Sequence, residues 1–418
     1  MPGRRRLLAD SLASLLDQAV LSALNLVLGL VLIRLTAKES YGIYSQLYVV
    51  GIFASSMIDS LVTGPLTTLA PGLDGTARAT LVAHLARYQQ RLATGLALAF
   101  GLLVAGITWW MAPEQQPLAL GVAFAVYVYA GSLREFGRSV GFIEARPRTV
   151  LRMDALYVLA VAVGIGALVA ADGLSLPAVM LVLGLANLVV LGLRELGPAA
   201  LADASGYAEA VAAAWLRGKW ALPGALLAWL TNYSYLSLAA LWLGVAATAD
   251  LNASRLLLMP ISLCVLAWSR VARPHVVRLL AERRKDALDR YAWASVAGIE
   301  VLTIGYVAVL WLMLPWLQHH VLGAKYTGVE PLVLAWGAYF ALNGARWIGS
   351  SLLTSGDRYR MLLLSGILCL VVMLAATSYA VPRWGAWGAV FALALVEALD
   401  LLLIWVVLLP RVRKEHFA

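Results

Sequence analysis

The sequence predicts an all-α membrane protein with about twelve transmembrane helices, and three observations support this fold class. Of the 418 residues, 62% are hydrophobic and only 13% are charged, whereas soluble globular domains are about 45–50% apolar and about 25% charged. The mean hydropathy is +0.82, so the chain has too few polar residues to cover a water-soluble particle. Apolar runs long enough to cross a bilayer as helices recur along the whole chain.

Twelve of these apolar runs are expected to be transmembrane helices, joined by short connections that leave no room for an extramembrane domain. Each run has the length of about 20 residues that a helix needs to span a bilayer. The chain is therefore not expected to be a soluble enzyme, a nucleic-acid-binding domain or a disulfide-rich secreted scaffold. The runs are residues 12–33, 43–65, 89–111, 117–138, 151–171, 174–194, 220–245, 251–272, 292–317, 329–353, 359–381 and 384–409.

No sequence motif indicates a cofactor, a metal site or a covalent catalytic residue. The two cysteines, Cys264 and Cys369, fall inside apolar runs and form no disulfide or zinc framework. His319 and His320 are adjacent, so they lack the i, i+4 spacing of helical metal ligands. The sequence contains no phosphate-binding glycine loop and no nucleophile elbow. We therefore expect neither an enzyme nor a protein that depends on a cofactor or a metal.

The 32 basic residues predict how the chain is oriented in the membrane. When the N-terminus is placed in the cytoplasm, 26 of them fall on the cytoplasmic side and 4 on the opposite side, and Arg255 and Arg346 lie inside spans. Such an excess of Lys and Arg on one side is the positive-inside pattern of membrane proteins. The net charge of +9 therefore indicates sidedness rather than a nucleic-acid partner, and both termini are expected to be cytoplasmic.

The chain also contains signs of an internal repeat. The short basic connection at Arg146-Pro147-Arg148 has a counterpart at Arg358-Tyr359-Arg360, 212 residues later. The first and the seventh predicted hairpins are offset by a similar distance. Two six-helix halves in the same orientation are one plan of secondary transporters, although short basic loops also recur by chance. We expect an N-terminal six-helix bundle over residues 1–205 and a C-terminal six-helix bundle over residues 206–418.

Polar side chains follow one side of three predicted helices. A charged residue in mid-membrane costs about 2.5–3.5 kcal/mol, so intramembrane polar groups are candidates for function. A narrow polar stripe suits a helix with one face toward a hydrated cavity, although a single Ser or Thr is more simply explained by a bond to its own helix. The stripes include Asp17 and Asn25 in the first span, Tyr48 and Asp59 in the second, and Tyr339, Asn343 and Arg346 in the tenth.

Two arginines, Arg255 and Arg346, lie deep within predicted spans. The guanidinium group stays protonated and its forked donors suit phosphate, so both residues are candidates for binding an anion. The alternative is a structural ion pair with Glu397, Asp400 or Glu300. The sequence leaves both interpretations open.

Two carboxylates, Asp17 and Asp59, lie in the first two predicted helices. A carboxylate in a partly desolvated cavity can exchange a proton or bind a cation, so both are candidates for coupling transport to a proton or sodium gradient. The alternative is that each pairs with a neighbouring helix. Asp154 stands two residues from Arg152 and is interpreted as an anchor at the membrane interface.

The first predicted hairpin carries a family resemblance. Its residues 32–45 read Leu-Ile-Arg-Leu-Thr-Ala-Lys-Glu-Ser-Tyr-Gly-Ile-Tyr-Ser, which resembles the segment that opens bacterial Wzx-type polysaccharide transporters of the multidrug/oligosaccharidyl-lipid/polysaccharide (MOP) superfamily. Asn25, Asp59 and the turn Ser355-Gly356-Asp357-Arg358 also suit that family. The chain has Ala37-Lys38 where Gly-Pro is usual in that family. The resemblance therefore indicates the superfamily rather than the exact subfamily.

The resemblance implies two six-helix bundles that form a V around a central cavity, and a flippase in the bacterial inner membrane. Its substrate would be a polyprenyl-pyrophosphate-linked oligosaccharide, which alternating access moves to the periplasmic leaflet for surface polysaccharide assembly. Membrane lipid and a coupling H⁺ or Na⁺ would be its other partners, and it would act as a monomer without a cofactor. Arg34, Arg255 and Arg346 would attract the pyrophosphate, Asn25, Asn232, Asn343, Tyr48, Tyr235 and Tyr339 would contact sugar, and Asp17 and Asp59 would couple the ion.

Two alternatives remain at this stage. A multidrug or small-molecule antiporter of the same superfamily would have an acidic, aromatic cavity without essential cations. A membrane polymerase or acyltransferase would need a catalytic loop outside the cell membrane, but the longest loops, 195–219 and 273–291, are cytoplasmic by the charge pattern. The predicted function is therefore transport, with the flippase placed first.

Overall fold

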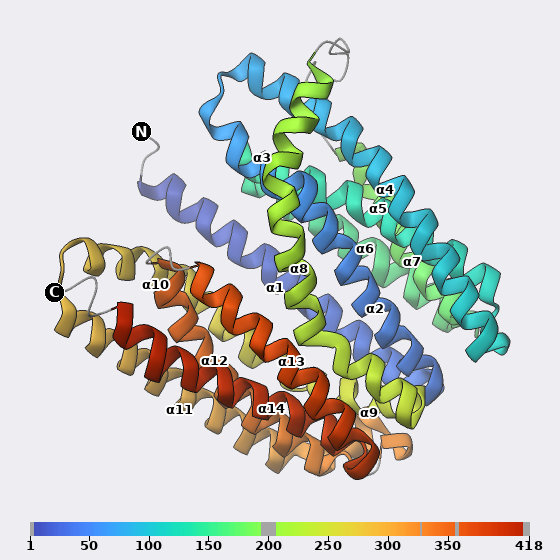
Figure 1. The fold of residues 1–418 in the computed structure, drawn as a ribbon. Helices are drawn as coiled ribbons and strands as arrows, with labels where there is room; N and C mark the ends of the chain where they lie inside the picture. Colours follow the sequence, from blue (N-terminus) through green and yellow to red (C-terminus); the bar gives the residue numbers. More distant parts are fainter. Residues whose placement is uncertain (1–3, 194–205, 327, 356–358, 413–418) are drawn as a thin grey trace. The chain divides into compact units, whose positions relative to one another are not determined.

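The computed structural model describes residues 4–193, 206–326, 328–355 and 359–412. Within these ranges the regular secondary structure is helical, without a strand (Figure 1). The predicted all-α membrane fold class is therefore confirmed. The turn at residues 356–358, which contributes to the family resemblance, lies outside the described residues. The predicted boundary between residues 205 and 206 falls at the edge of another undescribed range.

Packing between helices divides the chain into two compact units. The first unit contains the described parts of residues 1–28 and 47–226. Three long helices, α1, α2 and α8, contribute to both units. The helices of the first unit are α1 (Arg4–Leu35), α2 (Lys38–Ile58), the π-helical turn η1 (Asp59–Thr63), α3 (Gly64–Leu69), α4 (Gly75–Met111), α5 (Pro117–Ile143), α6 (Pro147–Ala170), α7 (Leu176–Val189) and the first part of α8 (Tyr207–Leu243).

Local sequence explains where these helices begin and how closely they pack. Pro117 and Pro147 occupy the first turns of α5 and α6, where the missing backbone N–H costs nothing. The Asp74 side chain caps α4 by accepting a hydrogen bond from the backbone N–H of Ala77 at 2.8 Å. Gly101 of α4 faces Gly121 of α5, and a Cβ at either position would come within 3 Å of the other's carbonyl oxygen. The absence of side chains therefore lets α4 and α5 lie in close contact.

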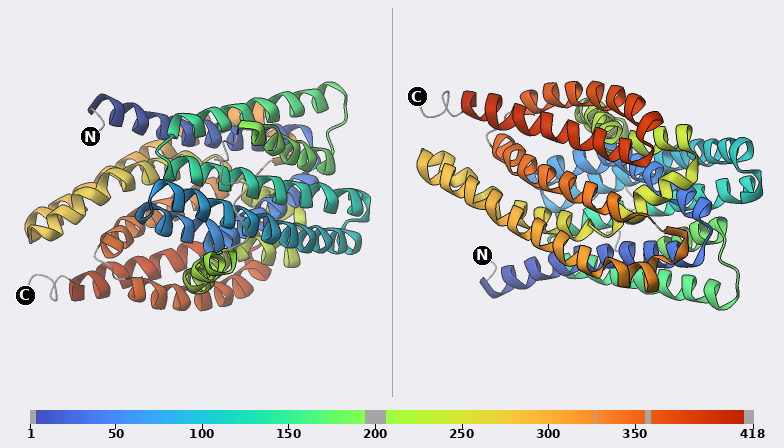
Figure 2. Two further views of the ribbon diagram at one scale, coloured as in Figure 1. Left: turned by 90° about the horizontal axis from the view of Figure 1, so that it is seen from above. Right: turned by 90° about the horizontal axis from the view of Figure 1, so that it is seen from below.

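The second unit contains the described parts of residues 29–46 and 227–418. Its last two helices form an antiparallel hairpin (Figure 2), and Gly385 supplies the positive φ of +61° that this turn requires. The helices are the ends of α1, α2 and α8, followed by α9 (Val245–Leu256), α10 (Met259–Ala281), α11 (Lys285–Leu317), α12 (Glu330–Ser355), α13 (Tyr359–Trp384) and α14 (Ala386–Leu402).

The hairpin that carries the family resemblance is attached to α9 within this second unit. A Cβ on Gly42 would lie 2.0 Å from the carbonyl oxygen of Val245, so only glycine allows this approach. Asn252 donates to the Tyr41 hydroxyl at 3.1 Å and to the Ser45 hydroxyl at 2.9 Å. The Tyr-Gly segment of the motif is therefore a helix-packing element.

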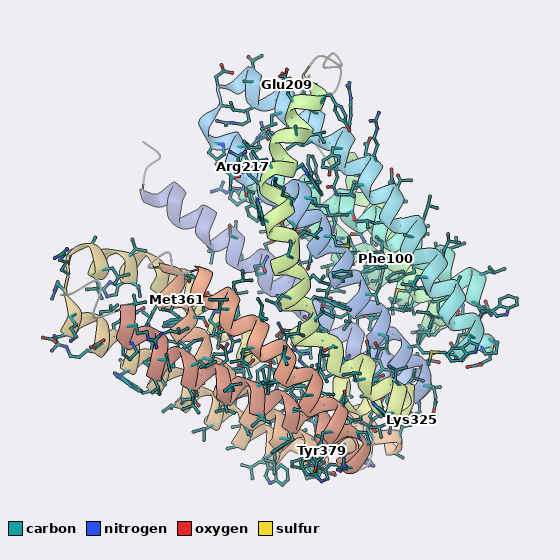
Figure 3. The ribbon with its side chains drawn as sticks, in the orientation of Figure 1. Phe100, Glu209, Arg217, Lys325, Met361 and Tyr379 are labelled. Atoms are coloured by element: carbon teal, nitrogen blue, oxygen red, sulfur yellow. The ribbon has the colours of Figure 1, made fainter. Side chains whose placement is uncertain are left out.

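Nine described helices are long and apolar enough to cross a membrane. The number is ten if α9 and the first part of α10, which are bent by 51°, count as one broken span. Each of the twelve predicted ranges overlaps a separate helix or helix pair. However, α7 is short for a membrane span at 14 residues, and α12, which carries the polar stripe, is not among the apolar candidates. Twelve crossings therefore remain a prediction. In Figure 3, Glu209 and Arg217 mark the polar start of α8, and Met361 and Tyr379 lie at opposite ends of α13.

Candidate functional site

A polar cavity of about 480 Å³ lies within the first unit. It contains three residues that the sequence analysis singled out, namely Asn25, Tyr48 and Asp59. The stripe on α2 explains part of this convergence, because residues three or four positions apart share one helical face. The other polar side chains of the lining are Ser55, Ser56, Ser60, Tyr127, Ser132, Arg134, Glu135, Tyr157 and Asn187.

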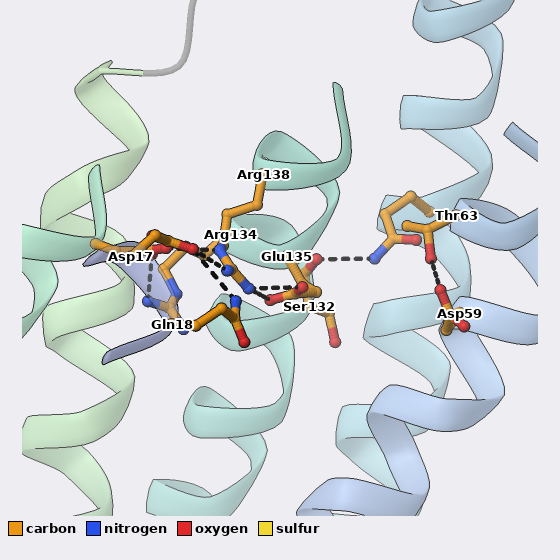
Figure 4. A network of polar contacts seen from close by, with 10 residues as sticks. Asp17, Gln18, Asp59, Thr63, Ser132, Arg134, Glu135 and Arg138 are labelled. Atoms are coloured by element: carbon orange, nitrogen blue, oxygen red, sulfur yellow. Dashed lines mark hydrogen bonds and ion pairs between the residues drawn. The ribbon is translucent and has the colours of Figure 1, made fainter. Parts of the chain in front are cut away.

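Asp59 stands at an exposed position of this cavity, where α2 passes into the π-helical turn η1. Its carboxylate accepts a hydrogen bond from the hydroxyl of Thr63 (Figure 4). The nearby Ser60 hydroxyl instead donates to the carbonyl of Ser56 at 2.8 Å. π-helical turns are rare and frequently occur at functional sites. No basic side chain lies within ion-pair distance of Asp59 among the described residues.

Asp17 belongs to a buried ionic cluster next to the cavity, centred on Arg138 of α5 (Figure 4). Arg138 donates through Nη2 to Asp17 at 2.9 Å, through Nε to Asp154 at 2.7 Å and through Nη1 to both oxygens of Glu135 at 2.8 Å. Arg134 donates to the second oxygen of Asp154 at 2.9 Å. Asp17 and Asp154 have no exposed surface. Asp17 therefore has the helix-to-helix pairing that the sequence analysis left open as the alternative to ion coupling.

In the second unit, Arg255 lies at the last turn of α9 in an aromatic environment. Its Nη1 donates to the Tyr235 hydroxyl at 2.9 Å. Its guanidinium carbon lies 5.4 Å from the ring centroid of Trp336 and 5.7 Å from that of Tyr233, which is within cation–π range. Among the described residues, its buried Nε has no hydrogen-bond partner and no carboxylate lies within ion-pair distance of its guanidinium. Arg255 therefore carries a charge that aromatic groups solvate and that no acid in the described part of the chain neutralises.

Arg346 of α12 has acidic partners on α14. Its Nε donates to Glu397, and its Nη1 lies 3.5 Å from Asp400. Asn343 and Tyr339 also donate to Glu397, at 3.1 Å and 3.4 Å. The structure thus contains the ion pair with Glu397 and Asp400 that the sequence analysis left open.

The remaining predicted residues lie apart from these clusters. Arg34 is exposed at the end of α1 and its guanidinium lies against Gly323. The backbone carbonyl of Arg34 and that of Thr36 accept from Lys325, at 3.4 Å and 2.9 Å. Asn232 is exposed on α8 and donates to its own helix at Ala228. In the part of the chain that the structure describes, no three His, Cys, Asp or Glu side chains are arranged to hold a metal ion.

Comparisons with known proteins show where this architecture occurs. No family model and no curated protein matches the sequence. The structure is similar to an inward-facing multidrug resistance MATE family transporter of the MOP superfamily, with a TM-score of 0.74 at 12% identity over 94% of this chain and 96% of that one. The chain has the fold of MOP-superfamily transporters.

Two further MOP-type structures support this assignment. The lipid II flippase MurJ, in an inward closed conformation, has a TM-score of 0.75 at 10% identity over 98% of this chain and 89% of that one. A MOP superfamily transporter from Pyrococcus furiosus, described by the reverse polarity of its binding pocket, has a TM-score of 0.66 at 10% identity over 99% of this chain and 96% of that one. These structural neighbours are transporters rather than enzymes.

Within this MOP-type fold, several residues around the first-unit cavity are not predicted by the sequence. Arg134 and Arg138 were counted only as cytoplasmic basic residues, although their i, i+4 spacing places both on one face of α5. The interpretation of Asp154 as an interface anchor misses its contacts, because its side chain is fully buried between these two arginines. Tyr157 and Asn187 have no charge and carried no signal in a single sequence.

Proposed function

We propose that the chain is a flippase of the bacterial inner membrane. It moves a polyprenyl-pyrophosphate-linked oligosaccharide from the cytoplasmic to the periplasmic leaflet, for the assembly of surface polysaccharide. The fold supports transport, and a lipid II flippase is among the structures that share it. Alternating access between two six-helix halves, residues 1–205 and 206–418, would expose the substrate first to one leaflet and then to the other. The proposed orientation has both termini in the cytoplasm, as the positive-inside pattern indicates.

The observation that carries this proposal is the charge of Arg255. Burying a guanidinium group is costly unless an anion or hydrogen-bond acceptors compensate it. Arg138 and Arg346 have carboxylate partners, but Arg255 has only the Tyr235 hydroxyl and aromatic rings among the described residues. A pyrophosphate group would supply the missing negative charge through charge-assisted hydrogen bonds.

The other predicted residues are assigned to anion binding, ion coupling or sugar contact in this proposal. Arg34 and Arg346 are secondary anion contacts, since Arg346 already binds acidic partners. Asp59 is the first candidate for ion coupling, because it is exposed in the cavity, and Asp17 is the second. The proposed sugar contacts are Asn25, Asn232, Asn343, Tyr48, Tyr235 and Tyr339.

The test measures translocation in proteoliposomes. A fluorescent farnesyl-pyrophosphate-linked disaccharide is loaded, and its appearance in the opposite leaflet is followed with a membrane-impermeant quencher. We expect Arg255→Gln to slow translocation at least about tenfold, because one or two charge-assisted hydrogen bonds are lost. The matched control is Arg383→Gln, since Arg383 also lies on a tyrosine ring but at an exposed position. Wild-type translocation by Arg255→Gln would overturn the proposal.

A second candidate function is export of cationic small molecules by antiport. The observation that favours it is the pair of carboxylates in the first-unit cavity, Asp59 and Glu135. Everted membrane vesicles separate the two functions: a cationic dye such as ethidium would accumulate in them on energisation only if the chain is an antiporter. Dye accumulation that is lost in Asp59→Asn, together with unchanged lipid translocation in Arg255→Gln, would favour this second function.

A further inference from the structure

The first-unit cavity is lined by a buried amide whose oxygen has no hydrogen-bond partner among the described residues. Asn187 of α7 is 1% exposed and lines the cavity. Its Nδ2 donates to the carbonyl of Leu183 at 2.8 Å, but its Oδ1 accepts no hydrogen bond from the residues that the structure describes. A buried acceptor without a donor is unfavourable, so such groups are normally satisfied by protein, water or ligand. Asn187 therefore presents an acceptor for a hydroxyl group that enters the cavity.

The walls of the cavity are suited to a polyhydroxylated ring. Tyr48, Tyr127 and Tyr157 contribute aromatic surface and hydroxyl groups, and Ser55 adds an exposed hydroxyl at the side of α2. A hydroxyl group both donates and accepts, which matches the hydroxyls of a sugar. Sites that hydrogen-bond a ligand's hydroxyl groups discriminate strongly against ligands without them.

The size of the cavity argues against an ion as its main occupant. About 480 Å³ exceeds by more than tenfold the volume of roughly 30 Å³ that one water molecule occupies in the liquid. It falls within the range of about 300–1,000 Å³ that is typical of small-molecule sites. The cavity therefore has room for a saccharide unit.

The charges around the cavity select against an acidic ligand. The cavity and its adjoining cluster contain four carboxylates and only two guanidinium groups, which is a formal charge of −2 when all are ionised. The carboxylate of Asp59 faces no basic partner in the described part of the chain. A second carboxylate brought into this space would be repelled, and in a partly desolvated site such repulsion is only weakly screened.

We infer that the first-unit cavity is a saccharide subsite that accepts an uncharged sugar unit and rejects a uronic acid. This inference rests on the proposed flippase function and specifies the sugar that the carrier recognises. Buried Asn187 would accept from one sugar hydroxyl, and exposed Asp59 would accept from another while repelling a carboxylate.

Three probes test the inference with the full-length protein in lipid nanodiscs. They are farnesyl pyrophosphate, its glucose conjugate and its glucuronic acid conjugate, and the last two differ only in carrying CH₂OH or COO⁻. Binding is followed by tryptophan fluorescence. We expect the glucose conjugate to bind about five- to tenfold more tightly than farnesyl pyrophosphate, as one or two hydrogen bonds would give. The glucuronic acid conjugate should lose this gain.

Two substitutions assign the effect to the cavity. Asn187→Leu should abolish the gain from glucose without changing the affinity for farnesyl pyrophosphate. Asp59→Asn should bring the affinity for the glucuronic acid conjugate to within about threefold of that for the glucose conjugate, since one repulsive charge is removed. Because Asp59 is exposed, this variant reports on the cavity whether or not Asn187→Leu folds.

Matched controls make comparable chemical changes elsewhere. Thr303→Val removes a different buried side-chain oxygen in α11, which like Asn187 Oδ1 has no hydrogen-bond partner among the described residues. Asp172→Asn changes an exposed loop residue at a φ of +50°, which asparagine tolerates. Both controls should bind all three probes as the wild type does.

The outcomes separate the two proposals. If farnesyl pyrophosphate itself fails to bind, the flippase function fails and the saccharide subsite with it. If farnesyl pyrophosphate binds but glucose adds no affinity, or glucuronic acid binds as tightly as glucose, the saccharide subsite alone is overturned.

Discussion

Arg138 in the first unit is buried and Arg255 in the second unit is half-buried, and the surroundings of these two arginines are opposite. Arg138 donates to three carboxylates on its own and two other helices. Arg255 meets one tyrosine hydroxyl and the faces of two aromatic rings, with no acid nearby among the described residues.

The difference indicates separate uses for the two charges. A guanidinium that its own protein neutralises holds helices together, and removing it leaves buried carboxylates without compensation. A guanidinium that only aromatic groups solvate retains its attraction for an external anion. The comparison therefore predicts large stability effects at the first site and large binding effects at the second.

Arg138→Met should have the largest effect on stability. Asp17 and Asp154 would remain buried without their shared partner, which should lower the free energy of unfolding by about 3–5 kcal/mol. Denaturant titration in detergent, followed by tryptophan fluorescence, measures this change. The matched control is Arg146→Met, because Arg146 pairs with Glu144 at a partly exposed position rather than in a buried cluster. Equal stability of the two variants would contradict the structural role of Arg138.

Arg346→Met should lower stability by less, about 2 kcal/mol, because a charge-assisted hydrogen bond to Glu397 and the ion pair with Asp400 are lost at a side chain that keeps some solvent contact. The double variant with Glu397→Gln should recover part of the loss. A double-mutant cycle in the same unfolding assay should give a coupling energy of about 1–3 kcal/mol. If the effects of the two substitutions on the unfolding free energy were strictly additive, the Arg346–Glu397 pair would contribute nothing to stability. Arg346 would then be as strong a candidate for anion binding as Arg255.

Arg255→Gln should change the unfolding free energy by about 1 kcal/mol, since it removes one hydrogen bond to a neutral hydroxyl and two cation–π contacts but also relieves a charge that no acid among the described residues neutralises. Its affinity for farnesyl pyrophosphate should nevertheless fall at least about tenfold. Unfolding and nanodisc binding assays on one protein preparation separate the two quantities. A loss of stability as large as that of Arg138→Met, without a loss of binding, would remove the contrast between the two sites.

Lys38→Met should have the smallest effect. The Lys38–Asp250 pair is 2.7 Å long but about one quarter exposed on each side chain, so its contribution should be about 0.5–1 kcal/mol. Lys38→Arg should retain the pair, and high salt should reduce the difference between the two variants. The prediction would be contradicted if Lys38→Met lowered the free energy of unfolding as much as Arg138→Met does and if high salt did not change that loss. Solvent exposure would then not distinguish weak ion pairs from strong ones in this chain.

Much of the fold and part of the candidate site could be predicted without tertiary structure. Each predicted span overlaps a helix, and Asn25, Tyr48 and Asp59 meet at one cavity because they lie on polar stripes that local helix geometry defines. Arg134, Arg138 and Asn187 were missed. The Asp17–Arg138 pair joins residues 121 positions apart, and no local pattern states which of many carboxylates an arginine will meet.

The sequence by itself determined that lipid is the main solvent, that the chain is helical, and which helix faces are polar. These are local properties, since hydropathy and the 3.6-residue period can be read from a window of about twenty residues. Only the tertiary structure decided which charges are neutralised and which remain available. That outcome depends on the packing of helices far apart in the chain, where a few ångströms separate an ion pair from an unpaired charge.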